Sequence, residues 1–155
     1  MEINRYPDGR IYRKKEDEEV VLKNAPKKKK HKYGAVKTTV GDLTFPTKKE
    51  ARHYTILMQM KRAGLIKSFE MQTTYEIFPG YRNTKGEKVQ AITYISDFDI
   101  TTLDGEVYVC DSKGMETAVF RIKKKLFGYK YGKDIVLFKE DSDIHKLIIG
   151  GDDNG

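Results

Sequence analysis

The sequence predicts an α+β fold of α/β character, with a helix, three strands, a second helix and a last strand arranged around one mixed sheet. Three observations support this order. A capped helix start lies at residues 47–50, apolar and polar side chains alternate between about 69 and 113, and an amphipathic stretch follows from about 118. With 155 residues, of which 38% are hydrophobic, the chain is long enough for one core and short for two domains.

Composition divides the chain into three segments. Residues 1–32 combine a turn, an acidic run and a lysine run, so we expect a flexible basic N-terminal arm there. The folded domain is expected to occupy residues 33–139. Residues 140–155 carry several aspartates and are expected to form an acidic C-terminal tail.

The first helix is predicted to begin after Pro46, because Thr47 and Glu50 have the spacing of a capping box. Its apolar face is predicted from Ala51, Tyr54, Leu57 and Met58, and its end from Ala63 and Gly64. Two interpretations of Glu50 stay open. Its carboxylate either completes the cap or, because it lies at the edge of the apolar face, points toward the sheet.

Three strands are expected next. The first runs from Phe69 to about Phe78, the second from about 88 to 102, and the third from 106 to about 113. Leu103, Asp104 and Gly105 are predicted to form a three-residue hairpin loop between the last two, with the glycine in the left-handed region.

The second helix is predicted from an apolar row. This row consists of Val119, Ile122, Leu126 and Tyr129, and Gly132 follows as a stop signal. Residues 135–138 are expected to form the final strand, reached through this crossover helix.

The hairpin loop determines which side chains meet. If Thr102 and Glu106 close the loop, Asp97 lies opposite Asp111, and Ile95 lies opposite Lys113. Asp97, Asp111 and Lys113 then emerge on one face of the sheet. A two-residue loop would instead place the two aspartates on opposite faces, so the prediction depends on this turn.

Two adjacent carboxylates repel each other unless they are solvated, one is protonated, or a cation lies between them. Mg²⁺ is held in this way by carboxylate oxygens and water, and a neighbouring lysine can stabilise charge on a phosphate. Asp99 competes with Asp97 because it lies on the same face, but Asp97 is preferred for its position opposite Asp111. The alternative to a metal site is that these charged residues simply form a solvated face of the hairpin. Tyr94, Phe98 and Cys110 are expected to be packing residues.

The charge distribution points to a polyanionic partner. The formal net charge is +7, and lysines and arginines gather without acids at 23–37 and 117–133. Four cations of the second block, on the second predicted helix, are possible phosphate contacts: Arg121, Lys123, Lys124 and Lys125. A solvated arm and a solvated helix face are the alternatives.

Several classes of protein are disfavoured. No apolar stretch approaches the ~20 residues of a membrane span, and the first residues do not have the pattern of a signal peptide. The single cysteine, Cys110, excludes a disulfide framework, so a reducing cytoplasm is the expected location. The three histidines, His31, His53 and His145, lack the spacing of a zinc site.

The order of Glu50 on the first helix, Asp97 on one strand and Asp111-Ser112-Lys113 on the next resembles the PD-(D/E)XK nuclease superfamily. The segments 32–35, 45–51 and 92–98 are similar to small phage-encoded members related to Holliday-junction resolvases. The resemblance covers roughly residues 32–138 and implies a restriction-endonuclease-like core.

The resemblance also implies roles. Asp97 and Asp111 would be ligands of Mg²⁺, or of Mn²⁺ as a substitute, with the carbonyl of Ser112 nearby. Lys113 would be the catalytic lysine, and Glu50 would be a third ligand or would hold a metal-bound water. Gln72 is implied more weakly, as a glutamine facing the site. Asp111 stands where the superfamily more often has glutamate.

The function implied is a Mg²⁺-dependent DNA endonuclease that hydrolyses phosphodiester bonds in branched DNA, such as a Holliday junction, during phage replication or recombination. A homodimer in the cytoplasm of a bacterial host is expected, because resolving a junction needs two cuts. Two alternatives stay open: a DNA-binding protein of the same fold with little catalysis, and a phage protein whose partner is a regulator.

Overall fold

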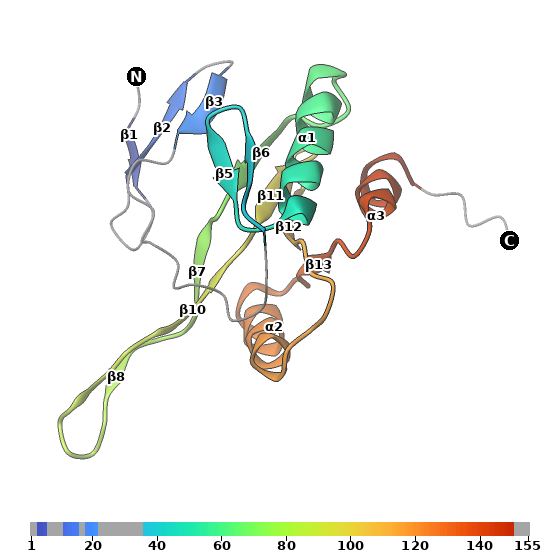
Figure 1. Ribbon diagram of the computed structural model, residues 1–155. Coiled ribbons are helices and arrows are strands. Elements are labelled where there is room, and N and C mark those ends of the chain that lie inside the picture. The colour runs from blue at the N-terminus through green and yellow to red at the C-terminus, as the bar shows by residue number, and fades with distance from the viewer. Residues whose placement is uncertain (1–2, 6–10, 16–17, 22–35, 151–155) are drawn as a thin grey trace, which may run out of the picture.

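The computed structural model describes residues 3–5, 11–15, 18–21 and 36–150 of the chain. It is a mixed α+β structure, as predicted, in which a central sheet is flanked by helices α1 (Lys48–Arg62), α2 (Ala118–Tyr131) and α3 (Asp141–His145) (Figure 1). None of the helices in the described ranges is long and apolar enough to span a bilayer.

The central sheet has the strand order β13-β12-β11-β6. Strands β6 (Ser68–Met71), β11 (Phe98–Thr101) and β12 (Val107–Asp111) are antiparallel, and β13 (Val136–Leu137) returns parallel to β12 after α2. The sheet is therefore mixed. In the β11–β12 ladder Thr101 lies opposite Val107, and Gly105 has φ 90°, so the predicted three-residue loop is confirmed.

The long strands predicted on either side of this hairpin are interrupted. The first divides into β6 and β7 (Thr74–Phe78), and the second into β9 (Lys88–Val89), β10 (Ile92–Ile95) and β11.

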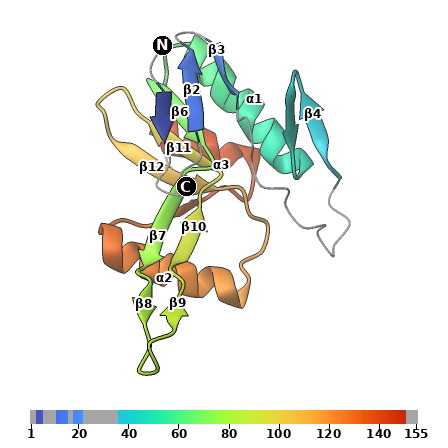
Figure 2. The same cartoon turned by 90° about the vertical axis from the view of Figure 1, so that its left-hand side faces the viewer.

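The strands β7 and β10 pair with each other, as do β8 (Tyr81–Arg82) and β9, in a ribbon that projects away from the sheet (Figure 2). Ile95 therefore pairs with Thr74, and its predicted pairing with Lys113 is wrong because the ribbon leaves the sheet there.

Both faces of the central sheet are covered. Neighbouring residues on β12 point to opposite sides, so Cys110 packs in a cluster with Leu57 of α1, while Val109 packs in a second cluster with Phe127 of α2. Burial of Cys110, predicted from its position, is confirmed. The sheet thus separates a core on the α1 side from a core on the α2 side.

The two helices differ in how well the sequence predicted them. Helix α1 begins where the Thr47 hydroxyl accepts a hydrogen bond from the Glu50 N–H at 3.1 Å, and it ends at Ala63, as predicted. The predicted apolar face of α2 is wrong: Val119, Ile122 and Tyr129 are exposed, whereas Phe120 and Phe127 are buried. These two phenylalanines lie seven residues apart and so share a face, and the larger aromatic side chains take the buried position.

The two ends of the chain also contain regular structure. Within the predicted arm, β1 (Ile3–Arg5), β2 (Ile11–Lys15) and β3 (Glu18–Val21) form an antiparallel sheet; the other residues of 1–32 lie outside the described ranges, and flexibility there stays a prediction. A hairpin of β4 (Thr38–Val40) and β5 (Leu43–Phe45) leads into α1.

Regular structure continues beyond the domain boundary predicted at residue 139. Helix α3 and one π-helical turn, η1 (Lys146–Gly150), follow it, and Ile144 is fully buried in the cluster on the α1 side. The packing of Ile144 outweighs the acidic character of the surrounding sequence. Residues 151–155 lie outside the described ranges.

Candidate active site

The candidate site lies where β11 and β12 separate from the ribbon. The β11–β12 ladder ends at the pair Phe98–Cys110, and the Asp97 N–H donates to the Cys110 carbonyl at 3.1 Å, so Asp97 lies at the end of the ladder, close to Asp111. The Ser112 N–H donates to Asp97 Oδ2 at 2.9 Å. The sheet thus brings together the two aspartates that the sequence predicted would meet.

Asp111 is buried and has two side-chain donors. The Tyr94 hydroxyl donates to Oδ2 at 3.0 Å, and the Lys113 ammonium lies 3.1 Å from Oδ1. The same ammonium lies 4.4 Å from the centre of the Phe120 ring, which attracts a cation through its face. Lys113 is therefore held at the site, with 31% of its side chain still exposed to solvent.

Asp97 is in a different electrostatic environment. Burial, followed by the nearby carboxylates of Asp111 and Glu50, raises its pKa to about 8, while Ser112 and Lys113 act in the opposite direction. A carboxyl group of this kind holds its proton near neutral pH unless a cation compensates the crowded negative charge. The geometry therefore favours binding of a positive ion beside Asp97.

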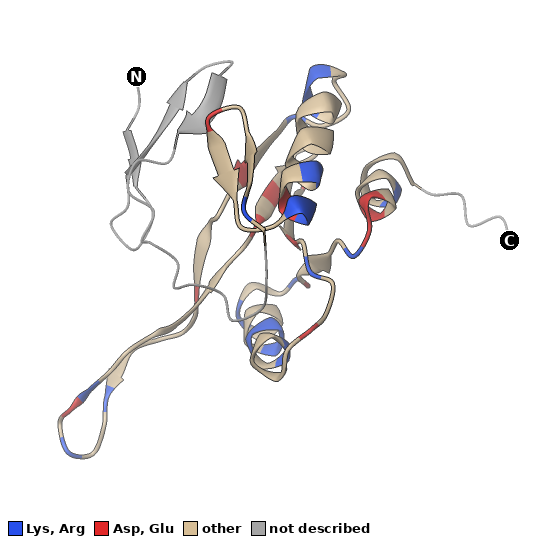
Figure 3. Cartoon of the chain, viewed as in Figure 1, with Lys and Arg blue, Asp and Glu red and all other residues tan. Residues whose placement is uncertain are grey.

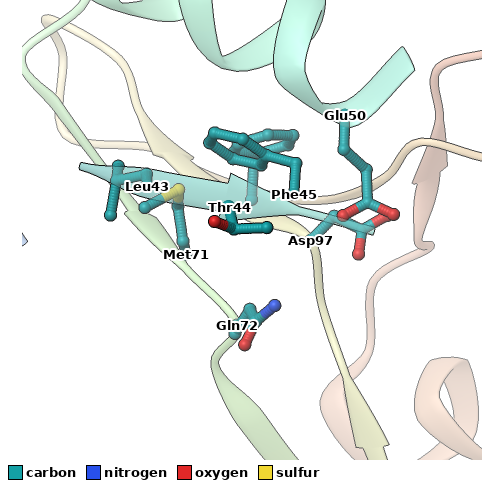
Figure 4. Close-up of a pocket in the computed structure, with 8 residues that line it drawn as sticks. Leu43, Thr44, Phe45, Glu50, Met71, Gln72 and Asp97 are labelled. Atoms are coloured by element: carbon teal, nitrogen blue, oxygen red, sulfur yellow. The ribbon is translucent and has the colours of Figure 1, made fainter. Parts of the chain in front are cut away.

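A small pocket of about 50 Å³ opens beside Asp97 and is lined also by Glu50, Gln72 and Phe45. Figure 4 shows the Glu50 and Asp97 carboxyl groups directed toward each other across it. The backbone N–H of Glu50 serves the helix cap, whereas its buried carboxyl group is directed toward Asp97, the second of the two orientations considered for it.

Gln72 lies in the break between β6 and β7, and the structure places it at the site. Its backbone φ is 55°, in the left-handed region, which no other non-glycine residue adopts in the described part of the chain. Its N–H donates to the Asp97 carbonyl at 3.3 Å, and its side chain lines the pocket. A left-handed glutamine costs about 1 kcal/mol, and such conformations concentrate at functional sites.

A second and wider hollow of about 370 Å³ opens on the other side, between β10 and α2. Its lining includes Asp111, Lys113, Phe120 and Lys123. The site is therefore reached from two directions: a narrow one at Asp97 and a broad one at Lys113.

Asp99, the competing aspartate, is already occupied. Its carboxylate accepts hydrogen bonds from the Tyr75 hydroxyl and from Ser96 Oγ, the latter at 2.7 Å. These bonds hold the turn that separates β10 from β11, so Asp99 supports the local fold and Asp97 is the aspartate available to the site.

The structure divides the basic residues predicted on α2 into two pairs. Lys123 donates to the Thr93 carbonyl at 2.9 Å, and Lys124 forms an ion pair with Glu116 at 3.1 Å. Arg121 and Lys125 are exposed. Arg121 also pairs with Glu116 at the longer distance of 3.9 Å, so Lys125 is the most open of the four to a phosphate.

Two residues of the site were not predicted. Tyr94 was assigned to packing, and its bond to Asp111 depends on a hydroxyl direction that no sequence pattern reveals. His53 is fully buried, with Nδ1 2.7 Å from Ser112 Oγ and Nε2 3.2 Å from Asp141 Oδ1. Its position three residues after Glu50, on the same face of α1, was a signal that could have identified it.

The oxygens of Asp97 and Asp111 suit a divalent cation, whereas a larger acidic cluster does not form around them within the described ranges. Among the described residues, no group of three His, Cys, Asp or Glu side chains is arranged to hold a metal ion together. The donors that fit a hard divalent ion are the paired oxygens of Asp97 and Asp111, with water completing the coordination, as Mg²⁺ commonly allows. Glu50 faces Asp97 without forming a three-acid cluster with the pair.

Comparison with known proteins gives one family. No curated protein and no solved structure matches the chain. A family model described as "Protein of unknown function (DUF1064)" matches residues 30–139, a range that contains Glu50, Asp97, Asp111 and Lys113. Because the match covers more than half of its length, the chain belongs to the DUF1064 family.

Proposed function

We propose that the protein is a divalent-metal-dependent DNA endonuclease that hydrolyses phosphodiester bonds at the site of Asp97, Asp111 and Lys113. One observation carries the proposal. Asp97 lies close to the buried Asp111, burial and then the neighbouring carboxylates raise the pKa of Asp97 to about 8, and Lys113 is paired with Asp111. This arrangement costs stability in the absence of a cation, which favours a catalytic or binding role over a structural one.

The oxygens of Asp97 and Asp111 would hold Mg²⁺, or Mn²⁺ in its place. When bound, the ion would supply positive charge to a phosphate oxygen and make water a better nucleophile. Lys113, in the lining of the wide hollow, can turn its ammonium from Asp111 to a non-bridging phosphate oxygen. Tyr94 keeps Asp111 oriented, and Glu50 can accept a hydrogen bond from a water in the narrow pocket.

The finer fold and substrate assignments rest on the resemblance to PD-(D/E)XK nucleases. The order of α1, the three antiparallel strands, α2 and the parallel β13 is compatible with a restriction-endonuclease-like core. Branched DNA is the proposed substrate class and a homodimer the proposed active form, because both cuts across a junction need an active site.

The experiment is a nicking assay on an end-labelled four-way junction and a matched duplex, with Mg²⁺, Mn²⁺ or Ca²⁺. We expect nicking of the junction with Mg²⁺ or Mn²⁺, and its loss by at least about 100-fold in Asp111→Asn, with DNA binding unchanged. The control is Asp104→Asn, which changes an exposed aspartate in the hairpin loop. A folded wild-type protein that binds DNA but nicks it with none of these metals would contradict the proposal.

A second function is favoured by one observation: the described residues contain no three-acid metal cluster. A DNA-binding protein with little catalysis would keep the basic surfaces and require no tightly held ion. Titration calorimetry with Mn²⁺ separates the two, because the nuclease should bind the ion and lose this binding in Asp97→Asn, whereas the pure DNA-binding protein should show no such heat.

A further inference from the structure

We propose that the projecting ribbon, residues 78–92, is a DNA-binding wing that holds the double helix about one turn away from the candidate site. This inference rests on the proposed action on DNA and adds a second contact surface to it. The wing belongs neither to the central sheet nor to the pockets at the aspartates.

The wing extends into solvent with little packing beneath it. Figures 1 and 2 show it leaving the body below β7 and β10 and ending in a narrow loop. Its residues are exposed except for Asn83, Val89 and Ala91, which are half-buried. Residues 78–92 belong to neither hydrophobic core, so they do not stabilise the fold by packing. Their exposed surface is instead available to bind a partner.

The wing is nevertheless built to be rigid. Asn83 organises the tip: its Oδ1 accepts from the N–H groups of Lys85 and Glu87 at 3.0 and 2.9 Å, and its own N–H donates to the Glu87 carbonyl. At the base, a Cβ on Gly80 would approach the Val89 carbonyl oxygen to 3.1 Å, so the two strands come unusually close there. A preorganised ribbon loses less entropy on binding than a flexible loop does.

The charge of the tip fits a phosphate backbone. Arg82, Lys85 and Lys88 are exposed there, and the single acid, Glu87, accepts a hydrogen bond from Asn83 Nδ2 at 2.6 Å. Figure 3 shows this cluster of charged positions at the end of the ribbon, far from the acids of the central sheet. The exposed surplus is therefore positive, which favours a polyanion over an acidic or neutral surface.

The reach of the wing fits duplex DNA. Nine residue steps separate Lys88 from Asp97 along the β10 side, which at about 3.3 Å each gives at most about 30 Å. One turn of the double helix is about 34 Å long, and its major groove admits a two-stranded ribbon. A duplex with its scissile phosphate at the aspartates can thus meet the tip close to one turn away.

The base of the wing suggests the main alternative, a protein partner. Phe78, Tyr81 and Ile92 are exposed there, and the first two rings pack against each other at 6.3 Å between centres. A protein partner would depend on the apolar side chains at the base, whereas DNA would depend on the cations at the tip. Substitutions at the base and at the tip therefore distinguish the two partners.

The test compares two variants that remove the same charge. In Arg82→Gln/Lys85→Gln/Lys88→Gln the tip loses three cations. In the control, Lys61→Gln/Arg62→Gln/Lys67→Gln, the end of α1 and the connection to β6 lose three exposed cations. Binding to a labelled duplex is measured in EDTA, so no cleavage is needed. We expect the dependence of log K on log salt to become shallower by about 1 to 3 in the tip variant only, at about 0.9 per lost phosphate contact.

A second measurement tests the spacing. In EDTA, wild-type affinity for a four-way junction should fall at least about 5-fold when its arms are shortened to below about 10 base pairs, whereas the tip variant should be insensitive to arm length. Equal affinity and salt slope in the tip and α1 variants would overturn the wing proposal, even if the protein cuts DNA. A wild-type protein that binds but never cuts, and still shows the tip effect, would overturn the nuclease proposal and keep the wing.

The protein-partner alternative has its own outcome. If Phe78→Ser/Tyr81→Ser changes the oligomeric state in sedimentation while the tip variant leaves DNA binding unaltered, the wing is a protein contact and the proposal is overturned. Circular dichroism spectra that match wild type show that each variant is folded.

Discussion

The two aspartates of the site have the same chemistry but opposite neighbourhoods. Asp111 accepts from a hydroxyl and faces an ammonium, so the chain itself supplies positive charge on that side. Asp97 faces two other carboxylates, and its pKa is raised to about 8. The protein therefore neutralises the negative charge of Asp111 with its own lysine and leaves the charge of Asp97 to be neutralised by a proton or a cation from solution. This pattern is expected of a binding site.

The largest expected effect comes from removing the cation on the compensated side. Lys113→Ala should lower the rate of junction nicking by about 100- to 1,000-fold, because a donor aimed at developing phosphate charge is lost. Single-turnover nicking with Mg²⁺ measures it. Lys67→Ala, an exposed lysine before β6, is the matched control, and a loss of the same size in both variants would show that the effect is not specific to the site.

The environment of Asp97 is tested by the pH dependence of the free energy of unfolding. Folded Asp97 keeps its proton up to a pKa of about 8, whereas the unfolded chain releases it near pH 4, so the folded state binds more protons in between and stability falls as pH rises from 4 to 8. Asp97→Asn removes this loss and should raise the free energy of unfolding at pH 8 by up to about 5 kcal/mol.

Urea unfolding at pH 5 and pH 8 measures this difference. Mn²⁺ should stabilise the wild type at pH 8 and leave Asp97→Asn unchanged, because a cation replaces the proton between the carboxylates. A wild-type stability that is equal at the two pH values and unaffected by Mn²⁺ would mean that Asp97 is not in the crowded environment described.

A smaller effect is expected for the hydroxyl that orients Asp111. Tyr94→Phe keeps the buried ring and deletes one hydrogen bond to a carboxylate, which should cost about 1 to 2 kcal/mol of stability and lower nicking about 10-fold. Thermal unfolding and the nicking assay measure the two. Tyr81→Phe, on the exposed wing, should change neither.

The smallest expected effect concerns the strained residue on the Asp97 side. Gln72→Gly relieves the left-handed backbone and should stabilise the fold by up to about 1 kcal/mol, while nicking falls because the side chain leaves the pocket. Gln72→Asn, which tolerates the same backbone, separates the contribution of the side chain from that of the strain. Lower stability in the glycine variant would show that the conformation is not strained.

The parts that sequence predicted well are those governed by local rules. The cap at Thr47 and the loop ending at Gly105 each follow from a few adjacent residues, and the loop sets the β11–β12 register that brings Asp97 close to Asp111. The interruptions at Gln72 and Ser96 could not be predicted, because both depend on the long-range pairing of β7 with β10.

The helix faces show the same limit. Helix α2 has two rows of apolar side chains, and the row with Phe120 and Phe127 is the buried one. Phe127 packs there against Tyr75 of β7 and Tyr94 of β10, so the buried face depends on strands distant in sequence. The bond from Tyr94 to Asp111 is part of that cluster and was missed for the same reason.

The contacts from Asp141 through His53 to Ser112, and from Ser112 to Asp97, connect the last helix to the acidic pair. Anyone designing a shorter expression fragment would be tempted to stop at residue 139, where the family match ends. Such a fragment would remove Asp141 and the buried Ile144, leave His53 facing solvent, and loosen the very serine that orients Asp97. Material for crystallisation or enzymology should therefore extend at least to residue 150.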